Sequence, residues 1–218
     1  MRLFVALDID DEIRNKISRF VGEVRELAPE ARWVQPESLH VTLKFIGEKS
    51  EQEVEKIKLA LGTTESKQTP CHSDPRATRG AEESLPFFSS KIEMSICGYG
   101  FFPNVRAPRV FWIGIASDAT LPLLAARIDE KLSAIGIPKE AHAFNPHLTL
   151  ARGAGGSGAP QRSKGDRPNR NFERLQEKLS ALPAPEFGAM TACEFFLYQS
   201  RLSPSGSVYT KLASFPLC

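Results

Sequence analysis

The sequence has almost no excess charge and no long apolar segment. Its 28 lysines and arginines nearly balance 26 aspartates and glutamates among 218 residues, which leaves a formal net charge of +2. This balance argues against a broad nucleic-acid-binding surface but leaves room for a local basic patch. No apolar run approaches the roughly 20 residues of a membrane-spanning helix, and the first residues show no cleavage-site pattern of a secretion signal. We therefore expect no membrane association.

Cysteine pairs and well-known metal or nucleotide motifs are also missing. The four cysteines are far apart and form no Cys-x-x-Cys pair, so the simplest interpretation is a reduced, cytoplasmic protein. The sequence contains neither the His-Glu-x-x-His motif of zinc proteases nor the Walker motif of P-loop nucleotidases. These absences direct attention to residues that could act without a metal.

Two short segments share one arrangement of histidine and threonine. His40-Val41-Thr42-Leu43 and His147-Leu148-Thr149-Leu150 each lie in an apolar run that predicts a strand, at 39–46 and 144–151. Residues i and i+2 of a strand face the same side, so each segment presents an imidazole and a hydroxyl on one face and packs its other face into a core. Two such faces turned toward each other would place two histidines around one small anion.

The two motifs belong to a longer internal repeat. They are 107 residues apart, and so are Arg2-Leu3-Phe4 and Arg109-Val110-Phe111. In each copy a strand, an amphipathic helix and the His-x-Thr strand follow in the same order. This order predicts a duplicated strand–helix–strand unit, and an approximate two-fold relation would bring the equivalent strands together at a central cleft.

The other patterns complete an α+β chain that we interpret as a single domain of residues 1–218. The predicted strands lie at 3–9, 32–34, 39–46, 87–97, 109–115, 144–151, 192–199 and 208–215, and the predicted helices at 11–27, 51–61, 121–135 and 172–182. Ser50 and Glu53 form a capping box. Segments 63–86 and 153–170 lack an apolar period and are expected to be flexible inserts. Trp33 and Trp112 are expected in the core.

The paired histidines suit acid–base chemistry at phosphorus. An imidazole with a pKa of about 6.5 can accept a proton from water or donate one to a leaving oxygen. Thr42 and Thr149 can donate hydrogen bonds to non-bridging phosphate oxygens, and Arg152 can add a cationic contact. This chemistry requires neither a metal nor another cofactor. The pseudo-symmetry of the repeat leaves open which histidine is the acid and which the base.

Five segments resemble the RNA 2′,3′-cyclic phosphodiesterase (LigT-like) family of the two-histidine (2H) phosphoesterase superfamily. The similar segments are 2–8 (RLFVALD), 39–48 (LHVTLKFIGE), 100–104 (GFFPN), 108–114 (PRVFWIG) and 146–152 (PHLTLAR). The resemblance implies a two-lobed α+β fold with antiparallel sheets lining a central cleft. It also implies hydrolysis of an RNA 2′,3′-cyclic phosphodiester to a 2′-phosphomonoester. In the family pattern His40 is the proton donor, His147 is the proton acceptor, and Arg152 matches the usual arginine after the second motif.

The implied partner is RNA, or a nucleotide, with a 2′,3′-cyclic phosphate end. A monomer is expected because one chain carries both half-sites. Other functions stay open: a 2′–5′ RNA ligase, a phosphodiesterase for another small nucleotide, or a non-catalytic RNA-binding module. A metal site of His40, His142 and His147 is a further alternative, although no set of carboxylates or cysteines accompanies it. We expect His72 and His142 at the surface.

Overall fold

The computed structural model describes residues 1–62, 91–153, 170–203 and 206–217. The expected inserts at 63–86 and 153–170 therefore lie outside the described residues, apart from Gly153 and Arg170. The elements are β1 (Arg2–Asp8), α1 (Asp11–Val24), η1 (Arg25–Leu27), β2 (Arg32–Trp33), η2 (Pro36–Ser38), β3 (His40–Glu48), α2 (Glu51–Leu61), β4 (Ile92–Phe102), β5 (Val110–Ser117), α3 (Thr120–Ala134), β6 (His147–Arg152), α4 (Glu173–Ser180), β7 (Glu186–Ala192), β8 (Glu194–Ser203) and β9 (Gly206–Pro216).

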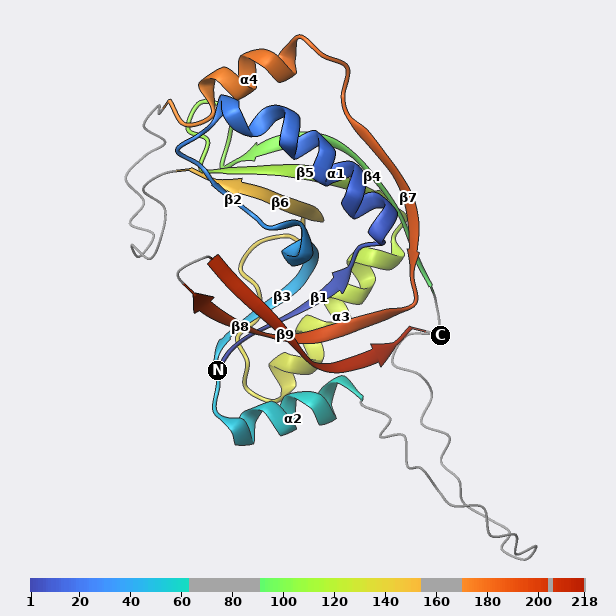
Figure 1. Ribbon diagram of the computed structural model, residues 1–218. Coiled ribbons are helices and arrows are strands. Elements are labelled where there is room, and N and C mark those ends of the chain that lie inside the picture. Colours follow the sequence, from blue (N-terminus) through green and yellow to red (C-terminus); the bar gives the residue numbers. More distant parts are fainter. Residues whose placement is uncertain (63–90, 154–169, 204–205, 218) are drawn as a thin grey trace, which may run out of the picture.

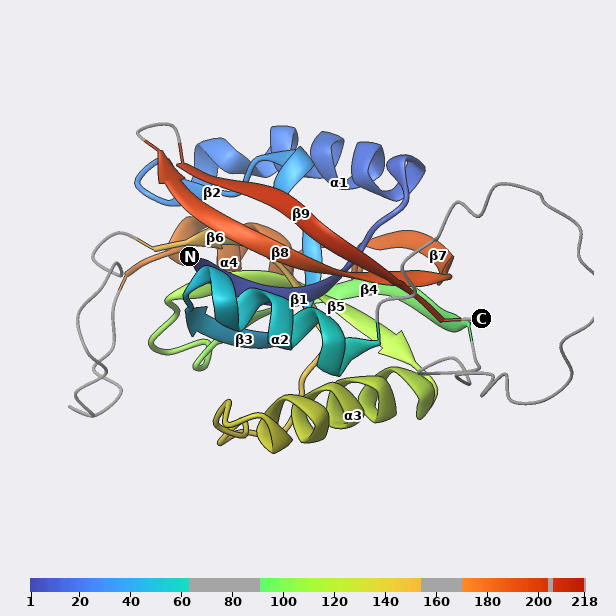
Figure 2. The same ribbon diagram turned by 90° about the horizontal axis from the view of Figure 1, so that it is seen from below.

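These strands form two antiparallel sheets (Figure 1). The four-stranded sheet has the order β3-β1-β8-β9, and the five-stranded sheet has the order β2-β6-β5-β4-β7. The predicted hairpin near the C-terminus is the pair β8–β9, which lies beside β1 in Figure 2. The expected α+β architecture with antiparallel sheets is thus confirmed. None of the described helices is long and apolar enough to span a membrane.

The predicted repeat appears as one strand pair in each sheet. β1 pairs with β3 in the four-stranded sheet, and β5 pairs with β6 in the five-stranded sheet. Both ladders skip a residue shortly after the His-x-Thr motif, Leu43 in β3 and Leu150 in β6, and the β1–β3 ladder also skips Ile46. Leu43 and Leu150 are 107 positions apart, as the histidines are. The repeat therefore extends to an equivalent β-bulge in each copy.

The helix of each repeat packs on the sheet of the other repeat. α1 follows β1 of the four-stranded sheet and leads into β2, and it contacts β7 of the five-stranded sheet, where the Phe20 and Phe187 rings meet edge to face at 5.4 Å. α3 connects β5 to β6, yet it contacts mainly β3 and α2, with a smaller contact to β4 of the five-stranded sheet. Figure 1 shows α1 and α4 beside the five-stranded sheet and α2 and α3 beside the four-stranded sheet. Buried apolar residues of both sheets consequently join in one core cluster.

Some local predictions differ from the structure. β7 was not predicted, because its sequence does not alternate: the ladder with β4 skips Phe187, and Gly188 adopts a φ of 118°. β6 begins at His147, three residues later than expected, since Pro146 before it has no N–H to donate to a sheet. The capping box was predicted correctly: Ser50 Oγ accepts from the Glu53 N–H at 3.3 Å, and the Ser50 N–H donates to Glu53 Oε2 at 2.8 Å.

Candidate active site

The His-x-Thr segments alternate as the sequence predicts. Val41 and Leu43 are buried in the core, with 0% and 4% of their surface exposed, whereas His40 and Thr42 are partly exposed on the other side. Leu148 and Leu150 are buried in the same way behind His147 and Thr149. We call the side of each sheet that carries His and Thr its histidine face.

The bulges bring a further residue onto each histidine face. Strict alternation would turn Arg152, five positions after His147, toward the core. Because the ladder skips Leu150, both Leu150 and Ala151 are buried and Arg152 returns to the histidine face. The equivalent slip in β3 buries Lys44 and exposes 59% of Phe45 on the face of His40. The sequence predicted Arg152 as a candidate site residue but did not indicate Phe45. Phe45 lies 107 residues before Arg152, so the internal repeat could have pointed to it.

Side chains from the two histidine faces act on one another. Strands β3 and β6 are in contact. The charges of His147 and Arg152, both on the five-stranded sheet, help to lower the pKa of His40 on the four-stranded sheet. Conversely, Tyr209 of β9, on the four-stranded sheet, acts electrostatically on Arg152 of the five-stranded sheet and opposes the lowering of its pKa. The structure therefore gathers the predicted histidines and arginine in one electrostatic neighbourhood, although they are far apart in the sequence.

The two histidines are held in the same tautomer. His40 Nδ1 lies 2.7 Å from the carbonyl oxygen of Ser38, and His147 Nδ1 lies 2.7 Å from that of Asn145. A carbonyl oxygen can only accept, so Nδ1 donates in both cases. In the neutral ring Nε2 then carries the lone pair, and it is the atom of each histidine that can exchange a proton with a substrate.

Burial lowers the pKa of both histidines, but their surroundings differ. For His40, the hydrogen bond to Ser38 and the Asp8 carboxylate oppose the lowering of the pKa, and Asp8 is the residue opposite His40 in the β1–β3 ladder. The residue opposite His147 is Gly114. For His147, only the hydrogen bond to Asn145 opposes the lowering of the pKa, and the Arg152 charge lowers the pKa further. The repeat is therefore electrostatically asymmetric at its centre.

Aromatic rings surround His40 on the four-stranded sheet. Its ring lies 4.7 Å from the Phe4 ring and meets the Tyr209 ring edge to face at 5.1 Å. Tyr198 stacks on Phe4 at 5.1 Å and donates a hydrogen bond to Asp8. These contacts limit the orientations that the His40 ring can adopt.

A second aromatic group holds His147. The Phe102 ring meets His147 edge to face at 4.9 Å and stacks on Trp112 at 5.0 Å. Trp112 lies opposite Thr149 in the β5–β6 ladder, so it belongs to the histidine face and its predicted place in the core was wrong. A Cβ at Gly100 would lie 2.2 Å from the indole, which explains why a glycine stands there. Trp33 packs against the core, as predicted.

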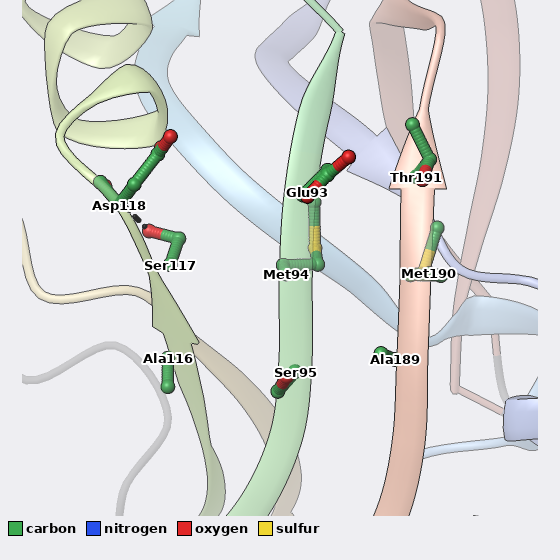
Figure 3. Close-up of a pocket in the computed structure, with 9 residues that line it drawn as sticks. All are labelled: Glu93, Met94, Ser95, Ala116, Ser117, Asp118, Ala189, Met190 and Thr191. Carbon is green, nitrogen blue, oxygen red and sulfur yellow. Dashed lines mark hydrogen bonds between the residues drawn. The ribbon is translucent and has the colours of Figure 1, made fainter.

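The histidine face of the five-stranded sheet has opposite charges at its two ends. Beyond Gly114 it continues into a cavity of about 460 Å³ (Figure 3), whose lining includes Glu93 and Asp118 and no basic side chain. At the other end, Arg152 lies opposite Arg32 of β2. The acidic end is unsuited to phosphate, and the basic end is suited to it.

The described residues contain no group of three or more His, Cys, Asp or Glu side chains placed to hold a metal ion. His142, the third member of the alternative metal site, is exposed, as expected for it. His72 lies outside the described residues.

Comparisons with known proteins agree along nearly the whole chain. The model of the LigT-like phosphoesterase family matches residues 7–74 and 113–209. The RNA 2′,3′-cyclic phosphodiesterase of Methanothermobacter thermautotrophicus is 31% identical over 217 residues, covering 100% of this chain and 99% of that protein. That of Archaeoglobus fulgidus is 32% identical over 215 residues, covering 99% of each. A crystal structure of a Thermus thermophilus protein superposes with a TM-score of 0.68 at 28% identity, covering 100% of this chain and 98% of that one.

Proposed function

The chain belongs to the LigT-like phosphoesterase family, and from this premise we propose that it is an RNA 2′,3′-cyclic phosphodiesterase. The observation that carries the proposal is the pair of histidines from equivalent strands, each tied through Nδ1 to a carbonyl so that Nε2 is left to react. Full-length relatives bear the name of this activity. A 2′,3′-cyclic phosphate requires a 2′-hydroxyl, so the substrate class is RNA.

The two histidines divide the proton transfers. His147 Nε2 takes a proton from water, and the water oxygen attacks phosphorus. The bond between phosphorus and O3′ breaks, and His40 Nε2 donates its proton to O3′. The products are a 2′-phosphomonoester and a free 3′-hydroxyl, and proton exchange with solvent resets the pair.

The Asp8 carboxylate supports this assignment of acid and base. A carboxylate near an imidazole stabilises the charged form of the ring. Asp8 lies opposite His40, whereas Gly114 lies opposite His147. Asp8 therefore favours the protonated form of His40 and has no counterpart opposite His147.

Three side chains suit the charge that develops on the phosphate. Thr42 and Thr149 share the histidine faces, and their hydroxyls can donate to the non-bridging oxygens. Arg152, whose charge acts on both histidines, can donate two parallel hydrogen bonds to the phosphate. We assign all three to phosphate binding and transition-state stabilisation.

Phe45 supplies an apolar surface for the nucleobase. Its ring is 59% exposed on the face of His40 and lies 6.3 Å from the buried Phe4 ring. Aromatic side chains of this kind stack on bases with a gain of about 1–3 kcal/mol per base. Stacking on Phe45 would orient the terminal ribose toward the histidines.

We further propose that the protein acts as a cytoplasmic monomer. Both histidines and the arginine come from one chain, so no second copy is needed to complete the site. Cys97 and Cys193, the two described cysteines, are free thiols, as expected in a reducing compartment.

Product analysis of a nucleoside 2′,3′-cyclic phosphate with excess chelator tests the function. We expect metal-independent release of the 2′-monophosphate and none of the 3′ isomer. Release that stops with chelator and returns with zinc would favour the metal-site alternative. Joining of RNA ends would favour the ligase, and binding without turnover would favour the RNA-binding module.

A further inference from the structure

The basic end of the histidine face holds more positive charge than a cyclic phosphate requires. Arg32 and Arg152 are opposite residues of the β2–β6 ladder, and both are exposed. Neighbouring strands lie about 4.8 Å apart, so side chains at opposite positions on one face are neighbours. Trp33, the next residue of β2, packs against the core, which leaves Arg32 on the side of Arg152.

A third arginine reaches the same place from the other sheet. Along β1, Leu3, Val5 and Leu7 are buried in the main core, so Arg2 shares the opposite side with Phe4 and Ala6. That side is the histidine face, since Phe4 contacts His40. The charges of Arg32 and Arg2 both act on Arg152 and, after burial, contribute to the lowering of its pKa.

The carboxylate opposite Arg2 is engaged by another group. Glu48 lies opposite Arg2 in the β1–β3 ladder, but its carboxylate is 3.5 Å from the N-terminal ammonium group. Guanidinium groups that repel one another gain most when an anion binds between them. One cyclic phosphate carries a single negative charge, which Arg152 alone can balance. The charges of Arg2 and Arg32 fit a second phosphate.

An RNA end offers that second phosphate at a fixed place. The phosphodiester 5′ to the terminal nucleoside is covalently linked to the group being hydrolysed. The opposite end of the histidine face is acidic through Glu93 and Asp118 (Figure 3), so the chain of phosphates is favoured toward the arginines. The net charge of the whole protein is only +2, so this attraction is local.

We propose that Arg2 and Arg32 bind the phosphodiester preceding the terminal nucleotide and thereby make the enzyme select RNA ends over free nucleoside 2′,3′-cyclic phosphates. The inference rests on the proposed function, because it concerns the same reaction. Arg152 contacts the reacting phosphate, whereas Arg2 and Arg32 determine specificity from one nucleotide away.

The test compares three substrates: a nucleoside 2′,3′-cyclic phosphate, a dinucleotide with the same cyclic end, and that dinucleotide with an uncharged methylphosphonate linkage. For the unmodified protein we expect kcat/KM on the charged dinucleotide to exceed the other two by about tenfold, the size of one charge-assisted contact. Arg2→Ala and Arg32→Ala should each remove much of this preference and leave the nucleoside cyclic phosphate within about twofold. Arg19→Ala, which removes an exposed arginine of α1, is the matched control.

Two outcomes would overturn the inference. The methylphosphonate could react as fast as the charged dinucleotide, or Arg2→Ala and Arg32→Ala could slow all three substrates equally. If the unmodified protein hydrolyses none of them, the proposed function fails separately. The affinities of the His147→Ala protein for the charged and uncharged dinucleotides, measured by calorimetry, then still decide whether the arginines recognise the second phosphate.

Discussion

At the residue scale, the two histidines differ in the residue that lies opposite each of them on the neighbouring strand. Their backbone tethers are the same, with Nδ1 2.7 Å from a carbonyl oxygen in both copies. Opposite His40 stands Asp8, which also accepts a hydrogen bond from Tyr198 and forms an ion pair with Lys211. Opposite His147 stands Gly114. Duplication supplied two like groups, and this one cross-strand residue makes their surroundings unlike.

Removal of either histidine should abolish most of the activity. We expect His40→Ala and His147→Ala each to lower kcat by about 10²–10⁴-fold, the usual contribution of a general acid or base. Single-turnover hydrolysis of a nucleoside 2′,3′-cyclic phosphate measures the loss. His142→Ala, which removes an exposed histidine, should leave the rate unchanged. Activity retained by either of the first two variants would remove that histidine from the mechanism.

The pH profile should show the asymmetry directly. The acid must be protonated, so activity falls as pH rises through its pKa, and the base must be neutral, so activity falls as pH drops through its pKa. Burial lowers both values, which places the bell-shaped profile of kcat/KM on the acid side of about 6.5. Asp8→Asn removes a carboxylate that raises the pKa of His40.

The alkaline limb of the Asp8→Asn profile should therefore move to lower pH while the acid limb stays. Glu12→Gln, on the exposed surface of α1, is the control for loss of one negative charge. Movement of the acid limb instead would exchange the roles of the two histidines.

At the scale of the elements, strand periodicity predicted which side the histidines and threonines occupy, because that rule is local. It could not predict the bulges, which depend on pairing with β1 and β5. Alternation would place Lys44 beside His40 and Thr42. In the structure Lys44 is 2% exposed and donates to Asp129 of α3 and, at 2.8 Å, to the Pro138 carbonyl oxygen. A local sequence pattern cannot indicate a partner that lies 85 residues away in the chain.

The errors in Trp112 and β7 have the same kind of cause. A tryptophan in an apolar strand usually belongs to a core, but Trp112 lies over Gly100, where the absence of a side chain makes room on the histidine face. The missed strand β7 is an edge strand with a skipped residue, so its apolar residues do not alternate. The internal repeat, by contrast, could be recognised because the same order of strand, helix and His-x-Thr strand occurs twice in the sequence.

Loss of the Lys44 ammonium group should destabilise the fold. Lys44→Met keeps the apolar stem but leaves the Asp129 carboxylate and the Pro138 carbonyl without this donor. We expect the free energy of unfolding to fall by about 2–4 kcal/mol, as for other buried polar groups that lose a partner. Urea denaturation measures the change.

The control for this prediction is Lys16→Met, which breaks the more exposed 2.8 Å ion pair with Glu12 on α1. That pair should contribute less than about 1 kcal/mol. Equal effects of the two substitutions would mean that the Lys44 contacts add nothing beyond a surface ion pair.

At the scale of the whole molecule, the exchanged helices make the two sheets depend on each other. α1 and α3 each leave one sheet and pack beside the other. The core cluster contains buried residues of both sheets. The relative position of His40 and His147 is therefore fixed by the same packing that stabilises the fold.

Such a core should unfold in one cooperative step, and the two tryptophans allow a sharp test. Trp33 and Trp112 both lie in the five-stranded sheet, whereas far-UV circular dichroism reports both sheets. Leu61→Ala truncates a fully buried residue of α2, beside the four-stranded sheet, and should cost about 2–5 kcal/mol. We expect the fluorescence and dichroism transitions in urea to shift together by the same amount. Leu59→Ala, on the same helix with 75% of Leu59 exposed, should shift neither. A Leu61→Ala protein whose dichroism changes before its tryptophan fluorescence would show that the sheets unfold independently.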